Sequence, residues 1–237
     1  PRPEFVGQPG LGFPAPWVAY RCLPGQTADR AGLTDPQRAA LARPLGEWLQ
    51  RLHALDPGEA RRRGAPGDTL GRTDLPRLLA LAQERARALP AEDAVAHAAL
   101  AAAWAALPPD ATAAGQRAAA VVHGDLYARH VLVDGADPTG LIDFGDLHVG
   151  DPALDLAIAW LLLPRAAHGA FRAAYGGVCA ATWARARFRA AHHAVAELSY
   201  ALDVGDGPLA RAARRALPTV LGRGRGAPAR PRQDATA

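Results

Sequence analysis

Apolar residues recur every three to four positions over most of the chain. Because this spacing places them on one face of a helix, it predicts helices rather than strands. We expect helices near residues 36–55, 75–89, 92–107, 153–163, 166–175, 182–202 and 208–221. Pro44 and Gly46 interrupt the first of these, which predicts a kink or two short helices.

Strand patterns are few and short. Trp17–Leu23 is aromatic and β-branched and lies between two prolines, which is typical of a strand. Val131–Asp134 and Leu141–Phe144 are apolar runs on either side of a turn at 135–139, which predicts a β-hairpin. Many helices and few strands predict an α+β protein.

The chain has 237 residues, of which 49% are hydrophobic and 21% charged. A chain of this length buries a sizeable core without disulfides or metals. Cys22 and Cys179 lie far apart and fit no metal-ligand spacing, which favours a reduced, cytoplasmic protein. We find no apolar run that could span a bilayer and no secretory signal pattern at the start. Because position 1 is not Met, we expect a fragment or a processed form.

Positive charge gathers at the C-terminal end. The net charge is +4, and residues 222–237 hold four Arg against one Asp, so three of the four excess charges lie there. This segment is rich in Gly and Pro and lacks an apolar period, so we expect a disordered, Arg-rich tail. Charge therefore gives no reason to expect nucleic-acid binding, and we expect neither a nucleic acid nor a membrane as partner.

Three side chains with useful chemistry flank the predicted hairpin. Asp125 precedes it, His130 lies at its entrance and Asp143 at its exit. Because a hairpin returns the chain to its starting end, we expect these residues to converge. The Asp143 carboxylate suits Mg²⁺, whereas His130 is a better ligand for softer metals. Asp125 is then left to orient and deprotonate an acceptor hydroxyl.

Three motifs follow one another around this hairpin. They are His123-Gly124-Asp125-Leu126, Ile142-Asp143-Phe144-Gly145-Asp146 and Gly150-Asp151-Pro152-Ala153-Leu154-Asp155-Leu156-Ala157. In order and spacing they resemble the aminoglycoside phosphotransferase family, kinase-fold enzymes that phosphorylate hydroxyls of antibiotics and small metabolites. The resemblance covers about residues 17 to 221 and is most specific over 121–160.

The resemblance implies a phosphoryl transfer that uses ATP or GTP and Mg²⁺. It makes Asp125 the catalytic aspartate, braced by His123, and Asp143 the metal-binding aspartate. It makes Asp155 a buried helix residue that hydrogen-bonds the backbone of the catalytic loop. It also implies that Leu132 and Ile142 make apolar contacts beneath the adenine ring. The hinge that hydrogen-bonds the base is then formed by Tyr20, Arg21, Cys22 and Leu23.

Two features depart from the family pattern. His130 stands where most members carry Asn as a second metal ligand, which resembles the macrolide-phosphotransferase branch. We therefore expect Asp143 and His130 as the metal residues. In addition, little sequence precedes the hinge, and the chain contains no Lys to pair with the α- and β-phosphates.

These features predict a protein-kinase-like fold that consists mainly of the helical C-terminal lobe, with a truncated N-terminal lobe. Residues 1–23 are then a remnant of the N-terminal lobe with the hinge. Residues 24–221 form the helical lobe with the catalytic hairpin, and 222–237 form the tail. Activity of this chain alone stays open.

Two functions remain open at this stage. The first is an ATP- or GTP-dependent kinase of a small-molecule hydroxyl, such as an aminoglycoside, a macrolide or a similar metabolite. The alternative is a non-catalytic kinase-fold protein that binds a nucleotide or a partner, which the missing lobe and the lack of Lys favour. An interaction scaffold has only the Arg-rich tail in its support.

Several polar residues also have two interpretations. Asp146 could reach the site or face solvent, and Arg129 could supply a cation near the γ-phosphate or lie on the surface. We expect His53 to pack or to favour a helix end through its charge.

Overall fold

The computed structural model describes residues 2–109, 111 and 119–222. The expected tail lies outside the described residues, apart from Gly222. Helices dominate, as the apolar spacing predicts. They are α1 Asp35–Ala40, α2 Ala42–His53, α3 Pro57–Arg62, α4 Leu75–Ala88, α5 Val95–Ala105, α6 Ala153–Leu156, α7 Ile158–Leu162, α8 His168–Tyr175, α9 Ala180–Val204 and α10 Gly207–Leu221, with 3₁₀ turns η1 Ala91–Asp93, η2 Ala128–His130, η3 Phe144–Asp146 and η4 Arg165–Ala167.

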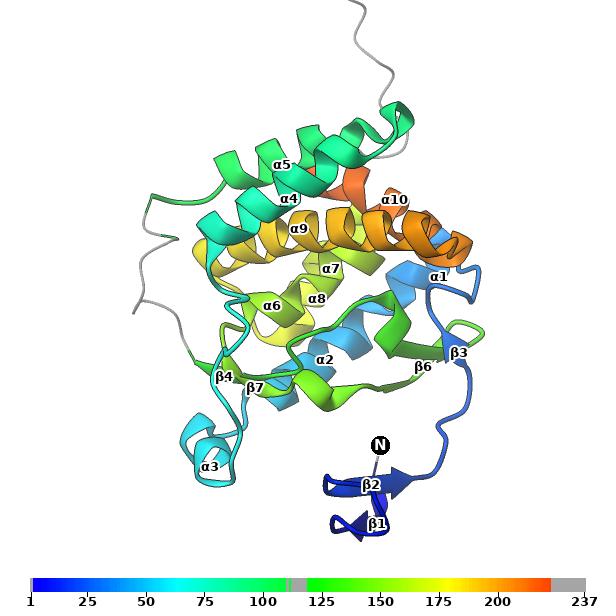
Figure 1. The fold of residues 1–237 in the computed structure, drawn as a ribbon. Helices are drawn as coiled ribbons and strands as arrows, with labels where there is room; N and C mark the ends of the chain where they lie inside the picture. The colour runs from blue at the N-terminus through cyan, green and yellow to red at the C-terminus, as the bar shows by residue number, and fades with distance from the viewer. Residues whose placement is uncertain (1, 110, 112–118, 223–237) are drawn as a thin grey trace, which may run out of the picture.

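Helix α9 is the central element of the helical body (Figure 1). Helices α4 and α5 cover one side of it, and α6 and α7 lie on the other, while α10 packs along it. Contact on several sides explains why α9 is buried around much of its circumference. The main hydrophobic core forms where these helices meet, and it includes Phe171, Phe188 and Leu198.

The first long helical pattern forms two helices, and the break lies at Leu41 rather than at Pro44 or Gly46. Pro44 falls in the first turn of α2, where its missing N–H does no harm. Gly46 instead allows α2 to approach α8 closely, because a Cβ there would lie 2.6 Å from the Phe171 carbonyl oxygen. Gly46 therefore lies inside α2 and serves a close contact between helices, while the predicted break occurs earlier, at Leu41.

The strands are short and form separate antiparallel pairs. Strand β4 (Ala120–Val122) pairs with β7 (His148–Gly150), and β5 (Val131–Asp134) lies between β3 (Gln26–Thr27) and β6 (Asp137–Leu141). The predicted hairpin is thus present. Its second strand ends at Leu141, so the expected strand over Leu141–Phe144 is wrong: Asp143 adopts φ +62° and Phe144 begins a 3₁₀ turn.

The N-terminal residues form a hairpin beside the helical body (Figure 1). Strand β1 (Pro3–Gly7) pairs with β2 (Trp17–Tyr20), which is shorter than the strand expected over 17–23. Large apolar side chains on this hairpin are exposed, including Phe5 and Val6. Among the described residues, no helix has the length and apolar content needed to cross a membrane.

Candidate active site

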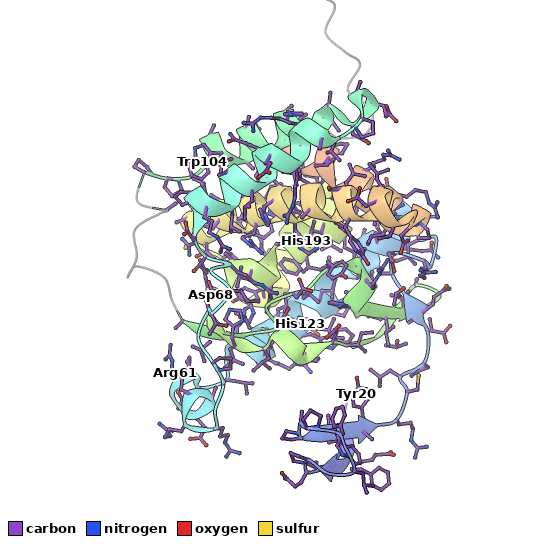
Figure 2. The ribbon with its side chains drawn as sticks, viewed as in Figure 1. Tyr20, Arg61, Asp68, Trp104, His123 and His193 are labelled. Atoms are coloured by element: carbon purple, nitrogen blue, oxygen red, sulfur yellow. The ribbon has the colours of Figure 1, made fainter. Side chains whose placement is uncertain are left out.

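The catalytic-loop candidate His123-Gly124-Asp125 directly follows β4. Gly124 adopts φ +86°, and a Cβ there would collide with the Asp146 carbonyl oxygen, so the position requires glycine. The backbone N–H of Asp125 donates to His123 Nδ1 at 3.3 Å, and His123 Nε2 donates to the Ile142 carbonyl at 2.8 Å. His123 therefore links the loop to the segment that carries Asp143 (Figure 2).

A buried carboxylate holds the loop from below. Asp155, on α6, is fully buried and accepts backbone N–H bonds from His123 at 2.7 Å and Gly124 at 2.9 Å. This is the arrangement that the sequence resemblance implied for Asp155. Burial opposes its ionisation, but hydrogen bonding to His53 and to the loop backbone outweighs it and lowers the Asp155 pKa below its ordinary value.

His53 completes this support, which its expected packing role had missed. Its Nε2 lies 2.9 Å from Asp155 Oδ2, and its Nδ1 lies 2.8 Å from the Tyr175 hydroxyl. Because a carboxylate only accepts, Nε2 donates to Asp155, while Nδ1 and the Tyr175 hydroxyl share the second hydrogen bond. The chain Tyr175–His53–Asp155 thus ties α8 and α2 to the loop. Local sequence gave no signal for it, since 102 residues separate His53 from Asp155.

His130 joins the two carboxylate-bearing segments. Its Nδ1 lies 2.7 Å from the Asp125 carbonyl oxygen, and its Nε2 lies 3.4 Å from Asp143 Oδ2. The Asp143 side chain is 63% exposed, whereas that of His130 is 8% exposed. The structure thus places Asp125, His130 and Asp143 at the entrance and exit of the β5–β6 hairpin, as expected from the sequence.

The His130–Asp143 pair fits a cation. The Asp125 carbonyl can only accept, so Nδ1 carries the ring proton and a neutral His130 presents a lone pair at Nε2. That lone pair faces a carboxylate oxygen, and two such donors attract a proton or a metal ion between them. Among the described residues, no cluster of three or more His, Cys, Asp or Glu could hold a metal, so His130 and Asp143 form a two-residue site there.

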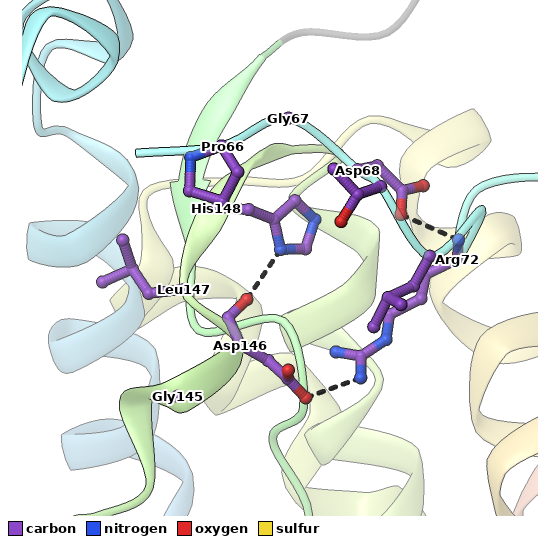
Figure 3. A pocket seen from close by; sticks show the side chains of 10 residues that line it. Pro66, Gly67, Asp68, Arg72, Gly145, Asp146, Leu147 and His148 are labelled. Carbon is purple, nitrogen blue, oxygen red and sulfur yellow. Dashed lines mark hydrogen bonds and ion pairs between the residues drawn. The ribbon is translucent and has the colours of Figure 1, made fainter. Parts of the chain in front are cut away.

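Arg72 is a further site residue, which the sequence did not reveal. Its Nη1 donates to the Gly124 carbonyl at 2.6 Å. Its Nη2 donates to Asp146 Oδ2, also at 2.6 Å (Figure 3). Asp68 accepts the Arg72 backbone N–H at 2.9 Å and so fixes the turn that presents the guanidinium. Asp146 therefore serves as an anchor for Arg72. Helix α3 lies earlier in the same polar segment, residues 56–73.

Charge around Asp125 partly offsets its burial. Burial raises the Asp125 pKa, while the positive charge of the nearby Arg72 acts in the opposite direction, and the net shift is upward. A carboxylate with a raised pKa is a stronger base toward a hydroxyl proton than an exposed one. Arg129, the other candidate for a cation near the γ-phosphate, instead forms ion pairs with Asp206 at 2.6 Å and Asp29 at 3.4 Å.

The residues expected to bind the base divide into two groups. Leu132 is buried on β5, opposite Gly140 of β6, and a Cβ at Gly140 would collide with the Leu23 side chain. Leu23, Leu132 and the half-buried Ile142 are therefore available as an apolar surface. Tyr20, Arg21 and Cys22 are exposed on and after the β1–β2 hairpin, and Tyr20 lies apart from His123 (Figure 2).

A family model described as the phosphotransferase enzyme family matches residues 1–190. The chain belongs to this family. That finding confirms the resemblance that the three motifs carry, and it places the chain among kinase-type transferases with a protein-kinase-like α+β fold. No curated protein sequence matches the chain.

Solved structures of phosphotransferases share the fold. The GDP complex of aminoglycoside 2'-phosphotransferase-IIIa has a TM-score of 0.61 and 21% identity, with 94% of this chain and 75% of that chain covered. The ternary complex of aminoglycoside phosphotransferase APH(4)-Ia with AMP-PNP and hygromycin B has a TM-score of 0.55 and 16% identity, over 96% and 78%. Macrolide 2'-phosphotransferase MphH from Brachybacterium faecium, as apoenzyme, has a TM-score of 0.52 and 27% identity, over 84% and 69%.

Proposed function

We propose that this protein transfers the γ-phosphoryl group of ATP or GTP to a hydroxyl of a small molecule. The acceptor is an antibiotic of the aminoglycoside or macrolide class or a similar metabolite. One observation supports this most: the His130 ring contacts both the Asp125 loop and Asp143, so a general base and a metal-binding carboxylate stand together. Family members in complex with GDP or AMP-PNP support a nucleotide donor.

Each site residue has a role in this proposal. Asp125 accepts the proton of the acceptor hydroxyl and orients its oxygen toward the phosphorus. His123 and Asp155 hold the Asp125 backbone in place, which matters because phosphoryl transfer depends on positioning more than on covalent chemistry. Leu132, Ile142 and the Tyr20–Leu23 hinge bind the base.

Asp143 and His130 are the residues that would hold Mg²⁺. A bound Mg²⁺ neutralises phosphate charge during transfer. The nitrogen of His130 is an uncommon Mg²⁺ ligand, so we expect Mn²⁺ to support activity at least as well as Mg²⁺. Exposed, unpaired thiols at Cys22 and Cys179 support placing the enzyme in the reducing cytoplasm.

The decisive test replaces the base. Asp125→Asn is expected to lower turnover by at least about a hundredfold, as for other general bases, with little change in nucleotide affinity. Transfer of ³²P from ATP and GTP to a panel of aminoglycosides, macrolides and sugars measures the first, and calorimetry the second. Asp137→Asn, exposed at the start of β6 in the same hairpin, is the matched control. Full turnover in Asp125→Asn would exclude the proposed role.

A second candidate is a protein that binds a nucleotide without transfer. The absence of Lys from all 237 residues favours it, because family-type transfer uses a cation on the donor phosphates. The two candidates separate in one experiment. Saturable nucleotide binding without labelled product for any acceptor supports the binder, whereas labelled product supports the enzyme.

A further inference from the structure

Helix α9 buries two arginines that differ in their partners. Arg185 donates to the Asp151 carboxylate from Nε at 2.7 Å and from Nη2 at 3.3 Å. Arg189 lies one turn further along and is 8% exposed, and its Nε and Nη1 have no hydrogen-bond partner in the described part of the chain. Buried donors without acceptors are costly, so these two nitrogens of Arg189 are available to donate to an oxygen atom that enters beside them.

The neighbours of Arg189 leave its charge in place. Burial and then the nearby Arg72 lower the Arg189 pKa to about 10, so the guanidinium stays protonated at neutral pH. His193, next to it, is neutral there, because burial and then the Arg189 charge lower the His193 pKa to about 3. Asp125 and Asp151 attract Arg189 through space without hydrogen-bonding it.

Arg189 and Asp125 line one cavity. Apolar side chains of Leu126, Leu154 and Leu161 form much of its remaining wall. Its volume is about 10 Å³, which is room for a single water-sized group. A group that enters this space meets a cation on one side and the proposed base on the other. A single oxygen atom attached to a larger molecule meets both requirements.

We propose that Arg189 binds an anionic oxygen of the acceptor, and that the acceptor is a hydroxyl compound carrying a carboxylate close to the hydroxyl that Asp125 orients. This inference rests on the proposed phosphoryl transfer. A carboxylate supplies the strong, charge-assisted acceptor that a guanidinium prefers. An ammonium group at the same place would meet Arg189 and, beyond Asp125, Arg72. Among the acceptors proposed above, the site therefore favours a carboxylate-bearing metabolite over a polycationic aminoglycoside.

The transfer itself balances without further reactants. The acceptor oxygen forms a bond to the γ-phosphorus of the nucleoside triphosphate as the bond from that phosphorus to the β–γ bridging oxygen breaks. The hydroxyl proton passes to Asp125, and the bond's electron pair leaves with the nucleoside diphosphate. Arg189 takes no part in these changes and acts by fixing the carboxylate end of the acceptor.

Three polyols on one carbon skeleton test the subsite: gluconate, glucitol and glucamine, which end in a carboxylate, a hydroxymethyl and an aminomethyl group. Calorimetry on the whole chain is expected to show gluconate binding at least about tenfold tighter than glucitol, the effect of one charge-assisted contact. Glucamine is expected to bind weakest. Equal affinities, or tightest binding of glucamine, would overturn the proposal.

Variants of Arg189 tie that preference to its guanidinium. In Arg189→Met, the ratio of gluconate affinity to glucitol affinity is expected to fall about tenfold, and in Arg189→Lys it should fall less. Arg189→Met should also melt at the same or a higher temperature, since an unpartnered buried charge is removed. Arg87→Met, exposed on α4, is the control and should change neither result. A gluconate preference that survives Arg189→Met, or a large drop in melting temperature, would sink the inference.

Turnover separates this inference from the proposed function. If gluconate binding depends on Arg189 but no acceptor is phosphorylated, the subsite stands and the phosphotransferase proposal fails. If acceptors are phosphorylated at rates that Arg189→Met leaves unchanged, the phosphotransferase proposal stands and the subsite fails.

Discussion

Two buried polar regions of this protein differ in whether their polar atoms have hydrogen-bond partners. Beneath the catalytic loop, Asp155 is fully buried and receives hydrogen bonds from two backbone amides and from His53. On the inner face of α9, atoms of Arg189, His192 and Glu197 are buried and have no hydrogen-bond partner among the described residues. The first arrangement fixes a backbone in one geometry, because every donor has its acceptor. In the second arrangement, the protonation state of the buried side chains depends on pH or on a bound ligand.

The largest effect is expected from breaking the region beneath the loop. Asp155→Ala leaves the amides of His123 and Gly124 and the His53 ring without an acceptor, so we expect a loss of about 3–5 kcal/mol in the free energy of unfolding. Phosphoryl transfer should fall below detection, since the Asp125 backbone loses its anchor. Urea unfolding measures the first effect. Asp203→Asn, exposed on α9, is the control, and an equal stability of both variants would contradict the assigned role.

The pH dependence of stability separates the two regions further. Burial, and then the charge of Asp29, raises the Glu197 pKa from 4.5 to about 8. Between these values the folded state keeps the proton and the unfolded state releases it, so the free energy of unfolding falls as pH rises. We expect Glu197→Gln to remove a decline of a few kcal/mol over this interval in urea unfolding. An unchanged slope in the variant would refute the burial-driven shift.

The lowered pKa of Asp155 acts with the opposite sign. Its stabilising contribution is fully present above the ordinary value of 3.8 and is lost as pH falls through the lowered folded value. Acid therefore weakens the region beneath the loop, whereas rising pH weakens the α9 face. In the Glu197→Gln experiment, the acid limb of the stability curve should stay where it is in the parent chain.

A smaller effect of opposite direction is expected at His192. Both of its ring nitrogens are buried and have no hydrogen-bond partner in the part of the chain that the structure describes. Burial, followed by the Arg189 charge, lowers its pKa to about 2. Replacing it with Leu removes unpaired polar atoms, so we expect a gain of about 1–2 kcal/mol in the free energy of unfolding. Thermal unfolding measures this. His97→Leu, exposed on α5, is the control, and a destabilised His192→Leu would show that the ring has partners after all.

The smallest effect should come from the outer end of the support beneath the loop. Tyr175→Phe removes one hydrogen bond to His53 Nδ1, which is worth about 1 kcal/mol. Phosphoryl transfer should fall only a few-fold, because Asp155 keeps its bonds to the loop. Tyr200→Phe, at an exposed hydroxyl on α9, is the matched control. A Tyr175→Phe variant as damaged as Asp155→Ala would mean that the chain acts as one unit.

The helical body and the order of the motifs could be predicted from the sequence. Apolar spacing located α4, α9 and α10 closely. The convergence of Asp125, His130 and Asp143 followed from a hairpin only a few residues long. Such features are encoded within one or two turns of chain, so they survive without knowledge of the fold.

The hydrogen-bond and ion-pair partners of the charged groups could not be predicted from the sequence. Arg72 meets Gly124 and Asp146 from 52 and 74 residues away, and Arg129 meets Asp206 from 77. Neither the left-handed Asp143 nor the early end of β6 left a signal, because both follow from what packs around the hairpin. Residues that lack a partner, such as Arg189, are equally invisible, since a lone Arg on a helix looks the same whether it is paired or not.

The sequence by itself determined that this chain is a helical kinase-fold phosphotransferase relative with two aspartates and a histidine at one hairpin. Only the tertiary structure decided which groups brace that hairpin and which face it without partners. The reason is physical: helix periodicity and turn chemistry are local, whereas a hydrogen bond between α2 and α6, or a cavity between α9 and the catalytic loop, exists only after the helices have packed.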